Sequence, residues 1–435
     1  MDETPRTDLF PVPVRPIGRL RQLLPVLPLV LLSVGCLIGP LLLPSCRPSD
    51  GPEVQEWQPV YLKGVPEVRV LIVRPQDSVT VSTTAGYRLY VGPQVVSESA
   101  EPAATVIVRR SGGRWAFNTM MLDGADVVLE PVGGLLKVGP IAYRGRLRFR
   151  VGGNEQVAVI NHVDLESYLA GVLPRELYAS WSQETYRALA VAARTFALYN
   201  LRQGGGSRDY DLGADESSQC YGGQSAETDK SWQAVRSTHG LVLAYGQPGR
   251  ERIFLAQYSS CCGGCVNDAA VIRSCEDIPP LRGGQACDDC RAASRYRWPA
   301  VRVSKTDLYD ALAVCYPKAR ELGGVSTIRA TSTTSYGRTV WIDVIGTTAG
   351  KSIRIRAEDL RLALLRGRVP AGKTLYSMNC QINDVGDHFT FTDGRGHGHG
   401  VGICQWGAEG KAQKGWSGEQ ILGYYYPQAK LLKAY

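Results

Sequence analysis

An uncharged and mostly apolar stretch at residues 23–44 divides this chain into a short leader and a long remainder. About 20 apolar residues are enough for a helix to cross a bilayer. Arg15, Arg19 and Arg21 precede the stretch, and the positive-inside rule therefore predicts that residues 1–22 are cytoplasmic. We expect those residues, which are rich in Pro and Arg, to form a disordered tail. The remainder of the chain must then fold outside the cytoplasm.

Three interpretations of residues 23–45 are open: an uncleaved transmembrane anchor, a lipoprotein signal, or an ordinary signal peptide. Its prolines disfavour a straight helix, although membrane helices tolerate proline better than soluble ones do. The sequence LPSC at residues 43–46 resembles a bacterial lipoprotein cleavage box, in which Cys46 would carry the lipid. All three interpretations place residues 47–435 outside the cytoplasm, in the periplasm or cell envelope. The first two also predict attachment to the membrane, with residues 46–60 as a linker.

Charge and motifs exclude several common function classes. The net charge of +8 over 435 residues is mild, and no basic face with interleaved aromatic residues stands out, so we expect no nucleic-acid partner. The chain has no Walker A loop, no dinucleotide fingerprint after a clear strand and no HExxH motif, which leaves the usual nucleotide-binding and zinc-protease classes without support. Its 48 Gly and 25 Pro residues favour a loop-rich β or α+β protein.

Strands predominate in the first part of the exported region. Segments of β-branched or alternating residues, separated by Gly, Pro and Asp, predict strands at residues 68–73, 78–82, 87–91, 104–109 and 147–151. The helical pattern begins near residue 164 and is mixed with further strands, without the alternation of a βαβ protein. We therefore predict an α+β fold, with a β-rich part at residues 61–160 and a second region at residues 161–435.

The run from residue 163 to residue 198 predicts two helices that meet at a proline. Asp164 is a suitable N-cap for a short first helix, which we expect Pro174 to interrupt. Ser182 is a suitable N-cap for a longer second helix, whose apolar spacing continues to about residue 201.

Glu176 lies at the junction of these helices, next to Leu177, Tyr178 and Trp181. Apolar and aromatic neighbours disfavour the carboxylate and raise the pKa of the acid, which keeps a carboxyl group able to donate a proton near neutral pH. The alternative is a turn residue that faces solvent, and the neighbouring Arg175 would lower the pKa. Glu176 is therefore the candidate general acid.

Five sequence boxes, in the same order, resemble those of the SpoIID/LytB family, which comprises stage II sporulation protein D and the LytB amidase enhancers. The first is GVLPREL followed by AVAARTFA, at residues 171–177 and 190–197. The others are SQCYGG at 218–223, QYSSCCGG at 257–264, GHGHGVGICQWGA at 396–408 and ILGYYY at 421–426. Five boxes in order are more specific than any single box. The resemblance covers about residues 65–430, and residues 161–435 form the SpoIID-like region.

The resemblance implies a lytic transglycosylase that acts on peptidoglycan glycan strands, with Glu176 at the position of the family's catalytic glutamate. Such an enzyme breaks the β-1,4 bond between N-acetylmuramic acid (MurNAc) and N-acetylglucosamine (GlcNAc) and leaves a 1,6-anhydro end. One carboxyl group acts first as acid and then as base, so no second carboxylate is needed at hydrolase spacing. Asp215, Glu216 and Glu184 are the nearby rivals, and nothing in the sequence favours them.

The LytB branch of the family implies a different function class as the alternative. The protein would then bind the cell wall and enhance a separate N-acetylmuramoyl-L-alanine amidase, without cutting anything itself. Both classes predict peptidoglycan strands as a partner, and a cell-wall amidase is a second possible partner.

The resemblance also implies a set of sugar-binding residues, because hydroxyl and acetamide groups need directed hydrogen bonds and sugar rings pack on aromatic faces. The candidates in the matched boxes are Arg194, Gln219, Tyr221, Tyr258, Ser260, His399 and Gln405. Structural roles are the alternative: an ion pair on the long helix for the arginine, a packed turn for Gln219 and Tyr221, and backbone hydrogen bonds for the histidine.

Residues 261–290 form a cysteine-rich insert without periodicity. It contains two CxxC pairs with a spacing close to that of zinc ribbons, and four thiolates close a tetrahedral structural zinc site. The expected ligands are Cys262, Cys265, Cys287 and Cys290, with Cys261 or Cys275 as a substitute for one of them. Some members of the resembled family carry a zinc near this strand. Disulfides are one alternative, because the protein is expected to be exported, and free thiols are the other.

Overall fold

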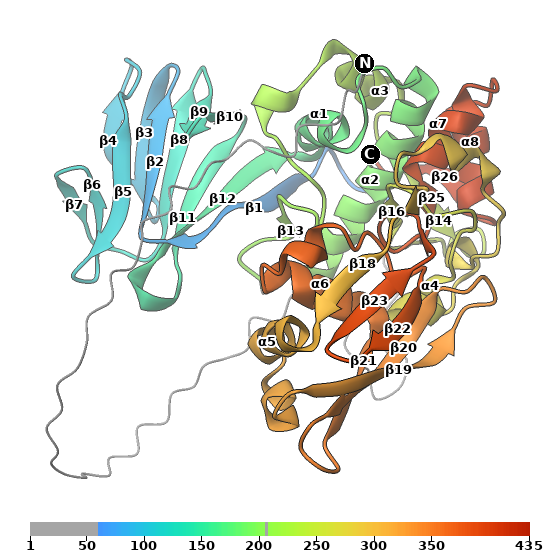
Figure 1. Ribbon diagram of the computed structural model, residues 1–435. Coiled ribbons are helices and arrows are strands. Elements are labelled where there is room, and N and C mark those ends of the chain that lie inside the picture. The colour runs from blue at the N-terminus through green and yellow to red at the C-terminus, as the bar shows by residue number, and fades with distance from the viewer. Residues whose placement is uncertain (1–59, 205–207) are drawn as a thin grey trace, which may run out of the picture. The chain divides into compact units, whose positions relative to one another are not determined.

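Helices and strands are mixed along the chain, which confirms the predicted α+β class (Figure 1). The computed structural model describes residues 60–204 and 208–435, which belong to one unit, Gly51–Tyr435. Within those two ranges, no helix is both long enough and apolar enough to cross a membrane. The tail predicted at residues 1–22 and the anchor predicted at residues 23–45 lie outside the described residues.

Two sheets contain the strands that precede the first helix. The larger sheet has the strand order β13-β1-β12-β11-β8-β3-β4, in which only β13 and β1 are parallel. Its strands are β1 (Glu67–Gln76), β3 (Gly86–Val91), β4 (Gln94–Ser99), β8 (Val127–Val132), β11 (Arg146–Val151), β12 (Val157–Asp164) and β13 (Leu212–Gly213). The smaller sheet has the order β10-β9-β2-β5-β6-β7. Its strands are β2 (Ser78–Thr83), β5 (Val106–Ser111), β6 (Arg114–Phe117), β7 (Met120–Leu122), β9 (Leu136–Val138) and β10 (Ile141–Tyr143).

The two sheets share one hydrophobic core. Trp115 and Phe117 from β6 meet Phe149 from β11 edge-on, with ring centroids 6.2 and 5.3 Å apart. Leu147 and Phe149 on β11 are buried, whereas the intervening Arg148 is not. This period of two is the pattern that predicts a strand with one buried face, and each strand predicted from it is present.

Helix α1 (Leu165–Glu176) begins as the sequence predicts but continues past its proline. Asp164 caps the helix by accepting a hydrogen bond from the Ser167 N–H (2.9 Å). The prediction that Pro174 interrupts the helix is wrong. This residue lies in the last turn, where proline removes a single backbone hydrogen bond, and the Leu177 N–H still donates to the carbonyl of Leu173 (2.9 Å).

The N-terminus of α2 (Gln183–Gly204) is stabilised by a carboxylate from α7 (Gln405–Ala412). Glu409 accepts hydrogen bonds from the Ser182 N–H (2.8 Å), the Ser182 hydroxyl (3.0 Å) and the Thr185 hydroxyl (2.7 Å). Negative charge at this end of a helix is favourable, because the free N–H groups point toward it. The long helix predicted to follow Ser182 is therefore confirmed, and its cap includes a residue far away in the sequence.

A buried ion pair joins α1 to α2. Arg194 is 0% exposed and Glu166 is 5% exposed. The guanidinium donates from Nε to Oε1 (2.9 Å) and from Nη2 to Oε2 (2.6 Å). The same carboxylate accepts hydrogen bonds from the Gly240 N–H (3.1 Å) and the Tyr435 hydroxyl (2.6 Å). Burial acts to raise the pKa of Glu166, but the charge of Arg194 and these hydrogen bonds outweigh it and the pKa lies below the ordinary value.

Short strands around α2 bring distant boxes together. β14 (Leu241–Tyr245) pairs with β15 (Arg252–Ile253) and with β26 (Lys430–Lys433). β16 (Tyr258–Ser259) pairs in parallel with β25 (Ile403–Cys404), so the third and fourth boxes lie side by side. The helices of this part are α3 (Asp229–Ser237), α4 (Ala269–Arg273) and α8 (Gly418–Tyr425). A capping box formed by Ser417 and Gln420 starts α8.

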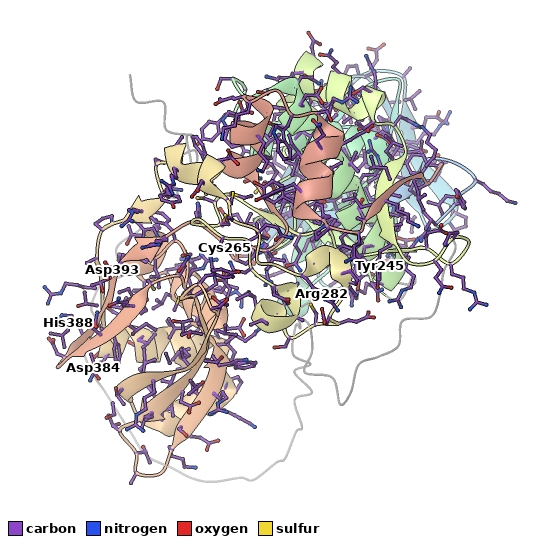
Figure 2. All side chains as sticks on the ribbon, turned by 90° about the vertical axis from the view of Figure 1, so that its right-hand side faces the viewer. Tyr245, Cys265, Arg282, Asp384, His388 and Asp393 are labelled. Atoms are coloured by element: carbon purple, nitrogen blue, oxygen red, sulfur yellow. The ribbon has the colours of Figure 1, made fainter. Side chains whose placement is uncertain are left out.

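The chain between β16 and β25 includes a part with its own hydrophobic core. Its strands are β17 (Arg297–Trp298), β18 (Val301–Ser304), β19 (Val325–Thr333), β20 (Thr339–Gly346), β21 (Ser352–Arg356), β22 (Gln381–Val385), β23 (His388–Thr392) and β24 (Gly394–Arg395), and its α-helices are α5 (Lys305–Cys315) and α6 (Ala357–Arg366). Figure 2 marks Asp384, His388 and Asp393 in this part and Cys265 in the cysteine-rich insert that precedes it. Short 3-10 helices are η1 (Gly153–Glu155), η2 (Gln224–Ala226), η3 (Pro279–Leu281), η4 (Asp288–Ala292), η5 (Pro317–Leu322) and η6 (Pro370–Lys373).

We expect the substitution Arg194→Met to lower the free energy of unfolding by about 3–5 kcal/mol, because it leaves a buried carboxylate without its cation. Arg187→Met is the control on the same helix. Its partner Glu184 is 3.7 Å away and the two side chains are 35% and 36% exposed, and exposed pairs contribute only about 0.2–1 kcal/mol. Urea unfolding followed by circular dichroism measures both variants. Equal losses in the two variants would contradict the structural role of the buried pair.

Candidate active site

Three of the five boxes converge on the carboxyl group of Glu176, the last residue of α1. Oε1 accepts a hydrogen bond from the backbone N–H of Cys220 (2.9 Å), in the second box. Oε2 accepts one from the side-chain amide of Gln405 (3.1 Å), in the fourth box. Residues that are far apart in the sequence thus hold both oxygens of one acid.

The pKa of Glu176 is raised above its ordinary value, chiefly because burial disfavours the charged form. The hydrogen bonds from Cys220 and Gln405 act in the opposite direction, and the charge of Glu216 adds a smaller increase. The residue keeps part of its surface accessible, so a ligand can reach a carboxyl group whose pKa is raised. The predicted rise in the pKa of Glu176 is confirmed, and the alternative of a solvent-facing turn residue is wrong.

The three rival carboxylates have other surroundings. Asp215 pairs with Arg74 (2.6 Å). Glu184 accepts a hydrogen bond from the Gly418 N–H (2.7 Å), and Glu216 is exposed. None of the three has the enclosed position of Glu176.

An aromatic cluster lies next to this acid in the sequence and in space. The rings of Tyr178, Trp181 and Trp406 are 5.1–5.6 Å apart between centroids, and Tyr178 and Trp406 are partly exposed. Trp406 directly follows Gln405, so the residue that binds the carboxyl group also brings an indole into the cluster. Flat aromatic faces beside an acid suit the binding of sugar rings. The sequence gives no separate signal for Trp406 beyond its place in the fourth box.

A second group with an aromatic ring and a cation lies close to Tyr178. The guanidinium of Arg295 lies over the ring of Tyr376 (4.3 Å), and this ring packs against His397 (5.2 Å). Burial raises the pKa of Tyr178, and the positive charge of Arg295 partly offsets that rise. Burial also lowers the pKa of His397 to about 4, so this histidine is neutral at physiological pH. None of these residues belongs to the predicted site.

Gln219 and Tyr221 support the site from inside the protein. Gln219 is 0% exposed, accepts a hydrogen bond from the Tyr168 hydroxyl (3.1 Å) and donates one to the Tyr258 hydroxyl (2.9 Å). Tyr221 donates to Asn161 (3.0 Å), and its ring lies 4.9 Å from that of Tyr168. These internal bonds favour a structural role over sugar binding for Gln219 and Tyr221. The ion pair with Glu166 likewise favours a structural role for Arg194.

The remaining predicted residues lie on the strand pair β16 and β25 or next to it. The hydroxyl of Tyr258 accepts the bond from Gln219, and burial raises the pKa of this tyrosine. The carbonyl of Ser260 accepts a hydrogen bond from the Trp406 N–H (3.1 Å). Nδ1 of His399 accepts one from the Val401 N–H (3.0 Å), which is the backbone-satisfied alternative. Of the predicted sugar-binding side chains, only Gln405 has a hydrogen bond to Glu176.

The cysteines of the insert do not group as their spacing predicts. The sulfur atoms within 4.8 Å of one another belong to Cys262, Cys287, Cys290 and Cys404, all buried and all free thiols. Cys265 (Figure 2) is partly exposed and does not belong to this group. It lies after the turn at Gly263 and Gly264, in a bridge with Ala286, whereas the pairing of β16 with β25 brings Cys404 beside Cys262. Cys404 thus lies where the spacing predicts Cys265, and metal binding by these cysteines stays a prediction.

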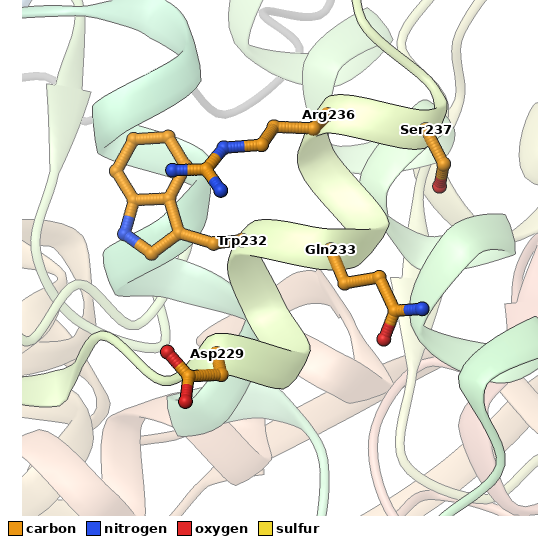
Figure 3. A pocket seen from close by; sticks show the side chains of 5 residues that line it. All are labelled: Asp229, Trp232, Gln233, Arg236 and Ser237. Carbon is orange, nitrogen blue, oxygen red and sulfur yellow. The ribbon is translucent and has the colours of Figure 1, made fainter.

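A hollow of about 670 Å³ lies on α3, and its lining includes neither Glu176 nor the aromatic cluster beside it (Figure 3). Its lining residues are Asp229, Trp232, Gln233, Arg236 and Ser237. The guanidinium of Arg236 covers the ring of Trp232 (5.1 Å), and the indole N–H donates to Glu227 (2.8 Å). The hollow is wide open to solvent, and its carboxyl group, that of Asp229, is exposed, unlike the enclosed carboxyl group of Glu176.

Comparison with known proteins agrees with this geometry. Residues 153–245, which include Glu176 and Cys220, match the family model described as SpoIID, Stage II sporulation protein. An uncharacterized protein of Brachyspira hyodysenteriae is 28% identical over 362 residues, which cover 82% of this chain and 91% of that protein. Stage II sporulation protein D of Bacillus subtilis is 28% identical over 291 residues, which cover 63% of this chain and 76% of that protein.

The amidase enhancer of Bacillus subtilis is also similar to this chain. It is 26% identical over 349 residues, which cover 70% of this chain but only 48% of the enhancer. This chain therefore spans about half the length of that relative. Both branches of the predicted family are represented among the relatives, and the resemblance is confirmed. The chain is therefore similar to proteins of the SpoIID/LytB family, and residues 153–245 match the SpoIID family model.

Proposed function

We propose that this protein is a lytic transglycosylase that cleaves the β-1,4 bond between MurNAc and GlcNAc in peptidoglycan glycan strands. The observation that carries the proposal is the environment of Glu176: an accessible acid with a raised pKa and one hydrogen-bond donor on each oxygen. The aromatic cluster of Tyr178, Trp181 and Trp406 supplies ring faces for sugars beside it. The similarity to the SpoIID family model and to stage II sporulation protein D supports the cell wall as the substrate class.

In the first step, protonated Glu176 donates its proton to the glycosidic oxygen as the bond from that oxygen to C1 of MurNAc breaks. The carboxylate that forms is stabilised by the N–H of Cys220 and the amide of Gln405, which already point at its oxygens. The donors need not reorganise when the charge appears. The GlcNAc part leaves with a new hydroxyl group.

In the second step, the Glu176 carboxylate takes the proton from the 6-hydroxyl of the same MurNAc as O6 bonds to C1. The products are a 1,6-anhydro end and a regenerated acid, so protons and bonds balance without water. A hydrolase would need a second carboxylate, about 5–9.5 Å from the first. Exposed Glu216 and salt-bridged Asp215 do not have the environment of such a partner.

The second candidate function is a cell-wall-binding protein that enhances a separate amidase. The similarity to the Bacillus subtilis amidase enhancer supports it. The aromatic cluster would serve either function, whereas the raised pKa of Glu176 serves only the enzyme. Release of 1,6-anhydro ends from purified glycan strands separates the two. Strand binding and amidase stimulation without such ends would favour the enhancer.

We also propose that the protein acts outside the cytoplasm, because its substrate lies there. Residues 23–45 would attach it to the membrane as an anchor, or Cys46 would do so as a lipidated residue. Both forms would hold the active site close to the wall.

The substitution Glu176→Gln should lower the rate of strand cleavage by about 10²–10⁴-fold, the usual contribution of general acid–base catalysis. It keeps the shape of the side chain but removes the transferable proton. Glu216→Gln, which neutralises an exposed carboxylate near the site, is the control and should retain most of the activity. Chromatography and mass spectrometry of anhydro products from glycan strands measure the rates. Full activity of Glu176→Gln would rule out the proposed acid.

Glu176→Gln should also stabilise the folded protein at neutral and alkaline pH. Because folding raises the pKa of Glu176 above 4.5, the stability that this group contributes is fully present below pH 4.5 and is lost as pH rises through the folded pKa. Glutamine stays neutral throughout, and the Gln405 amide can turn to bond with it. We therefore expect equal melting temperatures near pH 4 and a higher one for the variant near pH 8. A variant less stable than the wild type at pH 8 would contradict the raised pKa.

A further inference from the structure

The sulfur atoms of Cys262, Cys287, Cys290 and Cys404 have the spacing of a tetrahedral metal site. All four lie within 4.8 Å of one another, and those of Cys262 and Cys290 are 3.8 Å apart. Zinc bonded to four thiolates at 2.3 Å places its sulfurs about 3.8 Å apart. Cys262 lies in the loop after β16, Cys287 and Cys290 lie just before and within η4, and Cys404 lies on β25, so the site would join three separate segments.

The surroundings of the four sulfurs suit thiolates. Sγ of Cys404 accepts hydrogen bonds from the N–H groups of Cys262 and Gly407 (both 3.3 Å). The hydroxyl of Tyr425 lies 3.2 Å from Sγ of Cys287. Such donors around the ligands orient them and stabilise their charge. The helix also leaves room for the cluster, because a Cβ at Gly407 would lie 2.4 Å from Sγ of Cys287.

We propose that Cys262, Cys287, Cys290 and Cys404 bind one zinc ion and that this ion fixes Gln405 in its contact with Glu176. The first half rests on the sulfur geometry alone. The second half rests on the proposed function. Gln405 is thus a positioning residue for Glu176, and the neighbouring ligand Cys404 would hold Gln405 in place.

The link from the metal to the acid is one residue long. Cys404 is the N-cap of α7, and Gln405 and Trp406 are the first residues of that helix. The Gln405 amide donates to Glu176, and Trp406 belongs to the aromatic cluster. A ligand bond at Cys404 therefore fixes the start of α7 where the site needs it.

The cysteine-rich insert is docked to the same helix by a second contact. Asp289, between the two ligands of η4, pairs with Lys411 (2.8 Å), and both side chains are 10% exposed or less. A Cβ at Gly410 would lie 2.5 Å from the carbonyl of Asp289, so the helix and the insert are closely packed. The metal would complete a rigid connection between the insert and the first turn of α7.

Metal content of the purified full-length protein tests the ligand set. Inductively coupled plasma mass spectrometry should find one zinc per chain in the wild type and in Cys265→Ser, and a loss of most of it in Cys404→Ser. Cys265→Ser is the matched control. The CxxC spacing predicts Cys265 as a ligand, but its sulfur atom does not belong to the group of four. Metal loss in Cys265→Ser with retention in Cys404→Ser would overturn the assignment. A wild type without zinc, with disulfides between these cysteines, would also overturn it.

A Co²⁺-substituted protein keeps the test decisive if Cys404→Ser folds poorly. Four thiolates around Co²⁺ give strong sulfur-to-metal charge-transfer absorption and the visible bands of a tetrahedral ion. We expect this spectrum for the wild type and for Cys265→Ser. A six-coordinate spectrum, or one without the thiolate bands, would contradict the four-cysteine site.

The link to Glu176 is tested by comparing zinc removal with Gln405→Ala. The substitution removes a donor that stabilises the carboxylate, so the alkaline limb of the pH–rate profile should move to higher pH. Chelation of zinc from the wild type should move it in the same direction, and chelation should cause no additional shift in Gln405→Ala. An unchanged profile after complete metal removal would contradict the positioning role.

Tryptophan fluorescence gives a readout that does not depend on activity. Zinc removal should change the emission of the wild type, and the change should be much smaller in Trp406→Phe, because Trp406 directly follows Gln405 at the start of α7. Zinc binding without any lytic activity would leave the metal site intact and reject the proposed enzyme. An identical fluorescence change in both proteins would reject movement at the start of α7.

Discussion

The carboxyl group of Glu176 is held between the N–H of Cys220 and the amide of Gln405, and the proposed chemistry depends on this contact. Burial opposes the negative charge, whereas the two donors favour it. Burial therefore gives Glu176 a higher pKa than a free glutamate. The two hydrogen-bond donors still stabilise the carboxylate when it forms. An acid that must then act as a base needs both properties.

Much of the surrounding structure keeps these three residues in place. The buried pair of Arg194 with Glu166 fixes α1 against α2, and the carboxylate of Glu409 fixes the start of α2 against α7. Gln219 links Tyr168 to Tyr258 behind the site. Some residues of the five boxes therefore maintain the fold, and others belong to the candidate site. A sequence box can contain both kinds, because both make specific contacts.

Features that depend on local sequence were predictable. A few adjacent residues predict the alternating burial of β11, the N-cap at Asp164 and the apolar surroundings of Glu176. The structure has all three features. Pro174 was misjudged because the cost of a proline depends on whether a helix continues beyond it. The roles of Gln405, Trp406 and Cys404 were not predictable from spacing, since they arise from the pairing of β16 with β25 across a long intervening segment. The CxxC pattern favoured Cys265 over Cys404 because spacing describes only neighbours in the chain.

The most direct test of the account is the pKa of Glu176 itself. Carbon-13 NMR of protein labelled at the glutamate side-chain carboxyl groups follows each acid through a pH titration, and the signal missing in Glu176→Gln identifies the residue. The account predicts a midpoint clearly above the ordinary value of 4.5. A midpoint at or below that value would show that the acid is ionised at neutral pH and would contradict its role as proton donor.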